Sequence, residues 1–214
     1  MKVNEIFCSI SGESINSGKR SVFVRSYGCN LACSYCDSRY SWQGDDYTEM
    51  TVNDVVNQVA TYNCKYVVFT GGEPLLQEDA IELIATLLDK GYTVEVETNG
   101  AVSIEPVHKL NRPNIIVTMD WKCPSSKMNK KMLSSNLGLL THRDVLKCVV
   151  GSQKDLEEMR RVSEMTDAQV FVSPVFGQIE LREIAEYIIN ANLNKVRVQV
   201  QLHKLCWPSD MRGV

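Results

Sequence analysis

Apolar, β-branched runs recur along the chain and alternate with stretches of helical periodicity. The predicted strands are residues 21–28, 66–70, 93–98, 114–119, 145–150, 169–175 and 195–201. Apolar positions three and four apart predict helices within residues 51–62, 77–91, 152–165 and 180–193. Alternation of this kind is typical of parallel βαβ units. We therefore expect an α/β fold with about six to seven parallel strands, an incomplete TIM-type barrel.

Local signals place some of the element ends. Ser152 is a candidate N-cap with Asp155 as a weak capping box, and Gly91 stands where a helix should end. The turn-like NSGKR segment indicates that the first twenty residues add an antiparallel hairpin. Residues 124–141 fit a loop or a poor helix. Since no linker or low-complexity tract interrupts the chain, we expect a single domain over residues 1–214.

Composition excludes several classes of function. A formal charge of −3 argues against a general nucleic-acid or membrane-surface binder, and no apolar run reaches the length of a membrane span. The beginning of the chain lacks the features of a signal peptide, so we expect a cytoplasmic protein with reduced thiols. Five of the eight cysteines stand alone in or beside apolar runs and are expected to be small core residues: Cys8, Cys64, Cys123, Cys148 and Cys206.

Polar residues gather where the predicted strands end. These residues are Cys29, Thr70 to Glu73, Glu97 to Gly100, Asp120, Lys122, Ser173 and His203. In parallel α/β proteins the loops from several strands converge at their carboxyl ends, and ligands bind there. The sequence therefore predicts one ligand site at this edge of the sheet.

Three cysteines after the first predicted strand, Cys29, Cys33 and Cys36, form a C-x3-C-x2-C motif. Structural zinc and ferredoxin-type clusters both take four protein ligands, so either would need a distant fourth ligand here. Three thiolates with no fourth beside them suit a 4Fe–4S cluster that leaves one iron open to a substrate or cofactor. Spacing alone leaves the zinc interpretation open.

In its place after the first strand of an incomplete barrel, this motif resembles the signature of radical S-adenosylmethionine enzymes. TGGEP, from Thr70 to Pro74, resembles the glycine-rich motif whose backbone meets the methionine amino group in that family. The resemblance implies a radical SAM core. It also implies that Cys29, Cys33 and Cys36 hold a 4Fe–4S cluster, which reduces S-adenosylmethionine to give a 5′-deoxyadenosyl radical. Either motif alone is weak, and their order along the chain carries the resemblance.

The chain also resembles, more closely, the 7-carboxy-7-deazaguanine synthase family, from Glu5 to about Pro208. The segments that carry this resemblance are EIFCSISGES, VETNG and QLHKLCWP. Those lyases convert 6-carboxy-5,6,7,8-tetrahydropterin into 7-carboxy-7-deazaguanine with loss of ammonia, a step of queuosine biosynthesis. The resemblance implies the same pterin substrate, Mg²⁺ as a further cofactor and a homodimer. It also implies a one-electron donor such as flavodoxin or ferredoxin, and neither nucleic acid nor membrane as a partner.

The resemblance also assigns residues, with Arg25 and His203 expected in catalysis beside the cysteines. Substrate-binding residues would be Ile10, Ser11, Gly12, Glu13, Arg25, Thr70, His203 and Pro208. Residues for S-adenosylmethionine would be Tyr35, Cys36, Asp37, Gly72, Glu73, Glu97, Asp120, Trp121, Lys122, Ser173, Pro174, Val175 and Phe176. A guanidinium suits the substrate carboxylate, and the Ser38 hydroxyl takes the Mg²⁺ position.

Some residues depart from the family pattern, and other interpretations remain at this point. Ser11 and Ser14 stand where the family commonly has Gln and Gly, and the chain continues beyond Pro208. Taken singly, Arg25 could be a surface ion-pair partner and Ser38 an N-cap. Two other functions compete: an activase that makes glycyl radicals on a partner protein, and a non-catalytic metal or electron-transfer protein with a fourth fixed ligand.

Overall fold

The computed structural model describes residues 1–208 and 211–214. Within these residues nine strands form one sheet in the order β3-β1-β2-β4-β5-β6-β7-β8-β9. The parallel strands are β2 (Arg20–Ser26), β4 (Tyr66–Gly71), β5 (Thr93–Thr98), β6 (Ile115–Trp121), β7 (Val145–Val150), β8 (Gln169–Pro174) and β9 (Val196–Val198). The antiparallel strands β1 (Lys2–Ile10) and β3 (Thr48–Glu49) extend the edge beyond β2. The predicted α/β class, the incomplete barrel of about six to seven parallel strands and the N-terminal hairpin are confirmed.

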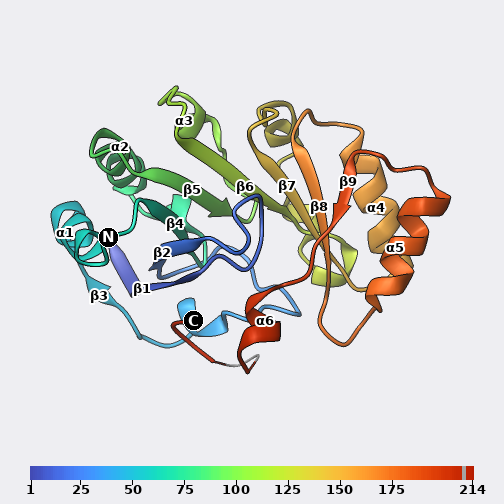
Figure 1. The fold of residues 1–214 in the computed structure, drawn as a ribbon, viewed down its shortest axis with the longest axis horizontal. Helices are drawn as coiled ribbons and strands as arrows, with labels where there is room; N and C mark the ends of the chain where they lie inside the picture. The colour runs from blue at the N-terminus through green and yellow to red at the C-terminus, as the bar shows by residue number, and fades with distance from the viewer. Residues whose placement is uncertain (209–210) are drawn as a thin grey trace.

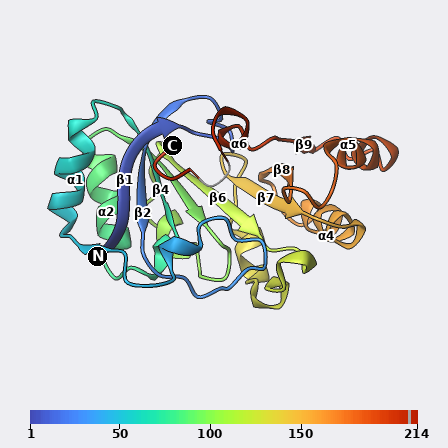
Figure 2. The same ribbon diagram turned by 90° about the horizontal axis from the view of Figure 1, so that it is seen from below.

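Helices cover the outer side of this curved sheet (Figure 1). They are α1 (Val52–Thr61), α2 (Ala80–Asp89), α3 (Glu105–His108), α4 (Gln153–Ser163) and α5 (Leu181–Asn190). The short helix α6 (His203–Cys206) lies on the other side, near the C-terminal residues and the β1–β2 hairpin (Figure 2). Single turns of 3-10 helix are η1 (Arg39–Ser41), η2 (Pro74–Leu76), η3 (Pro124–Ser126), η4 (Asn129–Lys131) and η5 (Ser134–Gly138). The last three fill the segment that showed no clear periodicity.

The helix ends follow the sequence signals in part. Gly91 follows α2 with φ +77°, the left-handed conformation that favours glycine after a helix. Ser152 occupies the N-cap of α4, but its side chain makes no capping hydrogen bond and pairs instead with Ser125 Oγ at 3.1 Å. The Asp155 carboxylate accepts from the N–H groups of Gly151 at 2.7 Å and Ser125 at 2.8 Å. The predicted capping box is therefore wrong, because Asp155 ties down the preceding loops.

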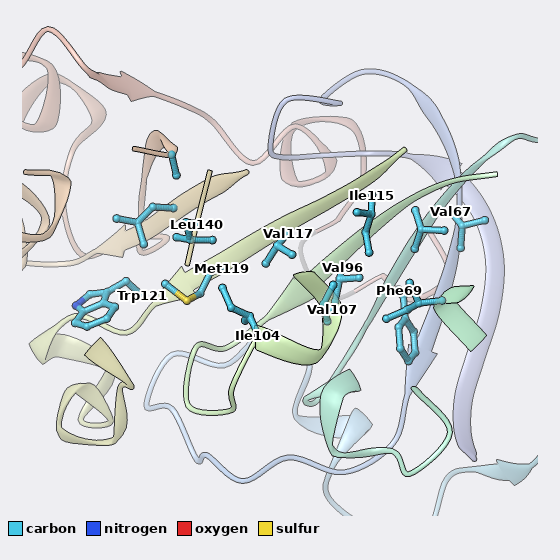
Figure 3. Packing of buried hydrophobic residues seen from close by; sticks show 14 of the residues in the cluster. Val67, Phe69, Val96, Ile104, Val107, Ile115, Val117, Met119, Trp121 and Leu140 are labelled. Carbon is cyan, nitrogen blue, oxygen red and sulfur yellow. The ribbon is translucent and has the colours of Figure 1, made fainter. Parts of the chain in front are cut away.

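Alternation along the strands separates an apolar outer layer from a polar inner face. On β6, Val117, Met119 and Trp121 pack into the buried core that faces the helices (Figure 3). Thr118 and Asp120, the residues between them, line a cavity on the concave side. Successive side chains of a strand point to opposite faces, so one strand supplies both the core and the cavity.

The solitary cysteines differ in burial. Cys123 and Cys148 are buried and belong to the outer core, and Cys8 and Cys64 are half-buried. Cys206 is exposed at the end of α6, so the prediction that it is a core residue is wrong. No helix in residues 1–208 and 211–214 is both long enough and apolar enough to span a bilayer.

The loop after β1 contacts the segment after β9, which joins the N-terminal hairpin to the C-terminal part of the chain. Ser14 N–H donates to Gln199 Oε1 at 2.7 Å, and Gln199 Nε2 donates to Ser14 O at 2.9 Å. Leu202 N–H donates to Gly12 O at 3.0 Å. Ser14 has φ +66°, a conformation that glycine adopts more easily, and its hydroxyl pairs with Thr118 Oγ1 at 2.9 Å.

Gln199→Ala is expected to lower the free energy of unfolding by about 1–3 kcal/mol, because it leaves the N–H group of the buried Ser14 without a partner and Ser14 O with only the bond from Ser17 N–H at 3.3 Å. Urea unfolding measures the loss. Asn57→Ala, at an exposed position of α1, is the control and should change stability by less than about 0.5 kcal/mol. Equal stability of Gln199→Ala and the unsubstituted chain would show that this contact does not hold the loop.

Candidate active site

A cavity of about 480 Å³ lies on the concave side of the sheet, a size typical of small-molecule sites. Side chains from β1, β2, β4, β5, β6 and β7 line it together with the cysteine loop, α6 and residues 211–214. The cavity includes residues near the carboxyl ends of β4, β5 and β6, where the sequence predicted a ligand site. Of the residues predicted for that site, the cavity is lined by Ile10, Gly12, Glu13, Arg25, Cys29, Cys33, Tyr35, Cys36, Asp37, Ser38, Thr70, Gly72, Glu97, Asp120, Lys122 and His203.

The three cysteines of the loop all line this cavity, and the thiols of Cys29 and Cys36 receive N–H donors. Leu31 N–H lies 3.4 Å and Asn99 Nδ2 lies 3.6 Å from Cys29 Sγ, and Trp42 Nε1 lies 3.4 Å from Cys36 Sγ. Such donors favour sulfur that carries negative charge, as metal-bound thiolates do. Burial raises the pKa of the Cys33 thiol to about 11, although the Lys122 ammonium group opposes the shift.

The spacing of potential ligands bears on which group the thiols could hold. Among the described residues, no three His, Cys, Asp or Glu side chains converge closely enough to bind one metal ion. A 4Fe–4S cluster presents separate irons to its thiolates and needs a wider arrangement than a single zinc ion. Three thiols on one loop are a donor set that by its chemistry fits a cluster held by Cys29, Cys33 and Cys36.

The glycine-rich turn after β4 packs directly against the beginning of the cysteine loop. A Cβ atom on Gly72 would lie 2.2 Å from Gly28 O and 2.9 Å from Cys29 Cβ, so no larger residue fits there. Glu73 N–H donates to Gly28 O at 2.8 Å. The close approach fixes the turn next to the thiols and leaves Gly72 on the cavity wall.

Glu73 lies outside the cavity lining, although the sequence predicted a cofactor contact. Its buried carboxylate accepts from Thr98 Oγ1 at 2.8 Å, Asn99 N–H at 2.7 Å and Leu75 N–H at 3.1 Å. Burial raises the pKa of this carboxyl group. Because protein donors already satisfy both oxygens, Glu73 joins the turn after β4 to the end of β5 instead of meeting a ligand.

One wall of the cavity carries a chain of ion pairs. Lys147 Nζ lies 3.1 Å from Glu13 Oε2 and 3.5 Å from Asp120 Oδ2, and Asp120 Oδ2 also lies 2.8 Å from Lys122 Nζ. Burial favours the neutral amine, but Glu13 and Asp120 outweigh it and raise the pKa of Lys147 well above its ordinary value. Burial opposes ionisation of Asp120 too, yet Lys122 and Lys147 lower its pKa. Lys147 and Asp120 are therefore charged at neutral pH.

Arg25 is held by one side of its guanidinium group. Its Nε donates to Glu5 Oε1 at 2.7 Å, and Tyr40 OH donates to the same oxygen at 3.1 Å. The guanidinium carbon lies 5.8 Å from the Phe7 ring centroid and 5.7 Å from that of Tyr40. Among the described residues, its two terminal nitrogens have no hydrogen-bond partner. A fixed guanidinium with its terminal N–H groups free suits a carboxylate in the cavity.

The close packing of α6 against the loop after β1 leaves no room for a side chain at position 12. A Cβ atom there would lie 2.2 Å from His203 Nδ1, so the histidine ring packs onto the bare backbone of Gly12. Burial lowers the pKa of His203 below its ordinary value. The next residue, Lys204, pairs with Asp37 at 3.0 Å and so joins α6 to the cysteine loop. Ser38 lies beside them on the cavity wall.

Glu97 gives the cavity a testable dependence on pH. Burial raises the pKa of this carboxyl group, which accepts from Thr70 Oγ1 at 2.8 Å. Its folded pKa exceeds the unfolded value, so its contribution to stability is present below about pH 4.5 and is lost as pH rises through the folded pKa.

As pH rises from 5 to 8, the free energy of unfolding of Glu97→Gln should therefore increase by on the order of 1 kcal/mol relative to that of the unsubstituted chain. Urea unfolding of the cluster-loaded chains under anaerobic conditions measures this difference. An effect of Glu97→Gln that is the same at both pH values would contradict the raised pKa.

Several residues predicted to contact ligands do not line the cavity. Trp121 points to the outer face, where its Nε1 donates to Glu158 Oε1 of α4 at 3.0 Å, so its side chain cannot reach a ligand in the cavity. Ser11 is buried, with its hydroxyl donating to Glu13 O at 3.1 Å. The remaining ones are Ser173, Pro174, Val175, Phe176 and Pro208. Ser173 Oγ is buried without a partner in the described residues, whereas Phe176 is 70% exposed.

Sequence reasoning missed other residues of the cavity wall. These are chiefly Tyr40, Trp42, Lys147, Gln201, Lys204 and Arg212. For Lys147 a signal existed, because it is the one charged residue in the apolar run VLKCVV. Arg212 is placed by an ion pair with Asp46 at 2.9 Å and by the Tyr40 ring, 3.9 Å away, contacts that sequence spacing does not reveal.

Comparison with known proteins agrees with this geometry. The model of the radical SAM superfamily matches residues 23–138, which include the cysteine loop and the glycine-rich turn. Members of that superfamily use a 4Fe–4S cluster and S-adenosylmethionine. The crystal structure of QueE from Escherichia coli has a similar fold, with a TM-score of 0.76, 23% identity and 94% of each chain covered.

Curated relatives are similar over the whole chain. A 7-carboxy-7-deazaguanine synthase from Clostridium acetobutylicum is 42% identical, with 100% of this chain and 99% of the relative covered. The enzyme of the same name from Thermoplasma acidophilum is 37% identical, with 100% of both chains covered. The chain therefore belongs to the radical SAM superfamily and, within it, to the 7-carboxy-7-deazaguanine synthase family.

Proposed function

We propose that this chain is a lyase that converts 6-carboxy-5,6,7,8-tetrahydropterin into 7-carboxy-7-deazaguanine with loss of ammonia. The observation that carries the proposal is a single cavity that contains both the three thiols and the groups that a carboxylated pterin needs. Arg25 offers terminal N–H groups to a carboxylate. Glu13 offers a carboxylate to the N–H-rich pyrimidine edge of a pterin, and the rings of Phe7 and Phe23 form an apolar part of the wall.

In this proposal Cys29, Cys33 and Cys36 hold the 4Fe–4S cluster. Gly72, Asp120 and Lys122 hold S-adenosylmethionine, with Tyr35, Asp37 and Glu97 on the same wall. With the cluster and S-adenosylmethionine bound, the site would supply one-electron chemistry for hydrogen abstraction from the substrate. The chain's own residues orient the pterin through Arg25 and Glu13, and the enclosing walls keep water from reactive species.

A second metal and further partners belong to the proposal as well. Ser38, on the cavity wall next to Asp37, would bind Mg²⁺ through its hydroxyl oxygen, which suits a hard cation. The substrate carboxylate would lie close to that ion and to Arg25. A flavodoxin- or ferredoxin-like protein would donate the electron, and the chain would act as one domain in a homodimer.

The test is anaerobic loading with iron and sulfide, followed by reaction with dithionite, S-adenosylmethionine, Mg²⁺ and 6-carboxytetrahydropterin. Mass spectrometry should detect 7-carboxy-7-deazaguanine, and omission of Mg²⁺ should lower its rate of formation. Cleavage of S-adenosylmethionine while the pterin stays intact would refute the substrate but keep the radical chemistry. A pterin without the 6-carboxylate is the matched control and should not react.

A further inference from the structure

Lys147, in the middle of β7, has no role in the proposal above. Its residue is 8% exposed, and the other five residues of the strand are apolar and buried. A buried charge loses its hydration, and buried ion pairs often contribute no more stability than apolar residues of similar size. Packing of the sheet therefore does not require a lysine at this position, and its ammonium group faces the cavity.

The two carboxylates that Lys147 contacts come from different parts of the cavity wall. Glu13 lies in the loop after β1, and its other oxygen, Oε1, accepts from Gln201 Nε2 at 3.2 Å. Asp120 lies on β6 and pairs through Oδ2 with Lys122 as well. Asp120 Oδ1 is buried and has no hydrogen-bond partner among the described residues, so it is available to a ligand. Glu13 belongs to the proposed substrate side and Asp120 to the proposed S-adenosylmethionine side.

We infer that Lys147 is a positioning residue that couples the binding of S-adenosylmethionine to the binding of the pterin. This inference rests on the proposed function. A ligand that binds Asp120 fixes the Asp120–Lys147–Glu13 chain, so the second ligand meets a Glu13 side chain that is already ordered. The coupling is reciprocal and should strengthen binding of each ligand roughly tenfold when the other is present.

The contacts on either side of Lys147 make the inference testable by substitution. In Lys147→Met, Glu13 keeps Gln201 and Asp120 keeps Lys122, so each carboxylate retains a partner and each ligand can still bind. The link between them is lost, and the coupling factor should fall to about one. Lys147→Arg keeps a cation within reach of both carboxylates and should restore part of the coupling. Lys154→Met, at an exposed position of α4, is the control and should keep the factor of the unsubstituted chain.

The experiment is calorimetric titration of 6-carboxytetrahydropterin into cluster-loaded protein, without a reductant, in the presence and absence of S-adenosylmethionine. The inference predicts about tenfold tighter binding with S-adenosylmethionine for the unsubstituted chain and no change for Lys147→Met. If Lys147→Met does not fold, Lys147→Gln is used in its place, and it too should show no change in pterin binding when S-adenosylmethionine is added. A merely structural lysine would weaken both affinities and leave their ratio intact, and that result would overturn the inference.

The outcomes also separate this inference from the proposed function. Binding of S-adenosylmethionine without any binding of the pterin to the unsubstituted chain would refute the proposed substrate and the inference with it. If the unsubstituted chain binds both ligands but neither changes the affinity for the other, the inference is overturned and the proposed function stands.

Discussion

Cys33→Ala is expected to abolish the iron–sulfur cluster and, with it, formation of 7-carboxy-7-deazaguanine. Cys33 is 9% exposed and faces the cavity, where two thiolates alone would hold the cluster too weakly. The buried Cys123 and Cys148 cannot replace it, because they belong to the outer core on the other face of the sheet. Iron content and the visible absorbance of the anaerobically loaded variant measure the loss, which should be at least tenfold in bound iron.

Cys206→Ala is the matched control for this experiment, because Cys206 is exposed and lies outside the cavity lining. It should bind as much iron as the unsubstituted chain and form product at the same rate. A Cys33→Ala variant with undiminished iron and activity would show that the three-thiol site is wrong.

Arg25→Gln is expected to raise the KM for 6-carboxytetrahydropterin about a hundredfold, or about 3 kcal/mol of lost binding. The structure anchors Nε on Glu5 and leaves both terminal nitrogens for the substrate carboxylate. Binding of S-adenosylmethionine should be unchanged. Arg25→Lys should recover little of the loss, since an ammonium group cannot donate in the planar fork of a guanidinium.

The control for Arg25 lies on the same strand. Arg20, at the beginning of β2, donates to the carbonyl oxygens of Tyr62 at 2.8 Å and Asn63 at 3.2 Å and does not line the cavity. Arg20→Gln should therefore leave the KM for the pterin unchanged. Steady-state kinetics compares the variants, and an unchanged KM for Arg25→Gln would remove Arg25 from the substrate site.

Sequence reasoning was most reliable where the signal is local. Both β5 and β7 were predicted to the residue, β5 because valine alternates with polar residues in TVEVET and β7 because VLKCVV is an almost continuous apolar run. The cysteine loop was recognisable because its three thiols are close along the chain. The Ser14–Gln199 contact has no such signal, since it joins residues 185 positions apart.

The alternation of side chains along a strand explains why Trp121, one of the residues predicted to bind the cofactor, lies outside the cavity lining. Asp120, Trp121 and Lys122 were predicted to hold one ligand together, yet adjacent residues of a strand point to opposite faces. Asp120 and Lys122 face the cavity, and Trp121 packs outward against Glu158. Glu73 lies outside the cavity lining for another reason. Its position in the glycine-rich motif suggested a ligand contact, but its carboxylate oxygens accept hydrogen bonds from the backbone N–H groups of Leu75 and Asn99.

The most direct test of the whole account is the electron paramagnetic resonance spectrum of the reduced cluster, recorded before and after addition of S-adenosylmethionine. Three protein thiolates leave one iron with an open coordination position, so the account predicts that the spectrum changes as S-adenosylmethionine binds that iron. An unchanged spectrum would mean that a fourth protein ligand closes the cluster, and the assignment of this cavity as a radical SAM active site would be contradicted.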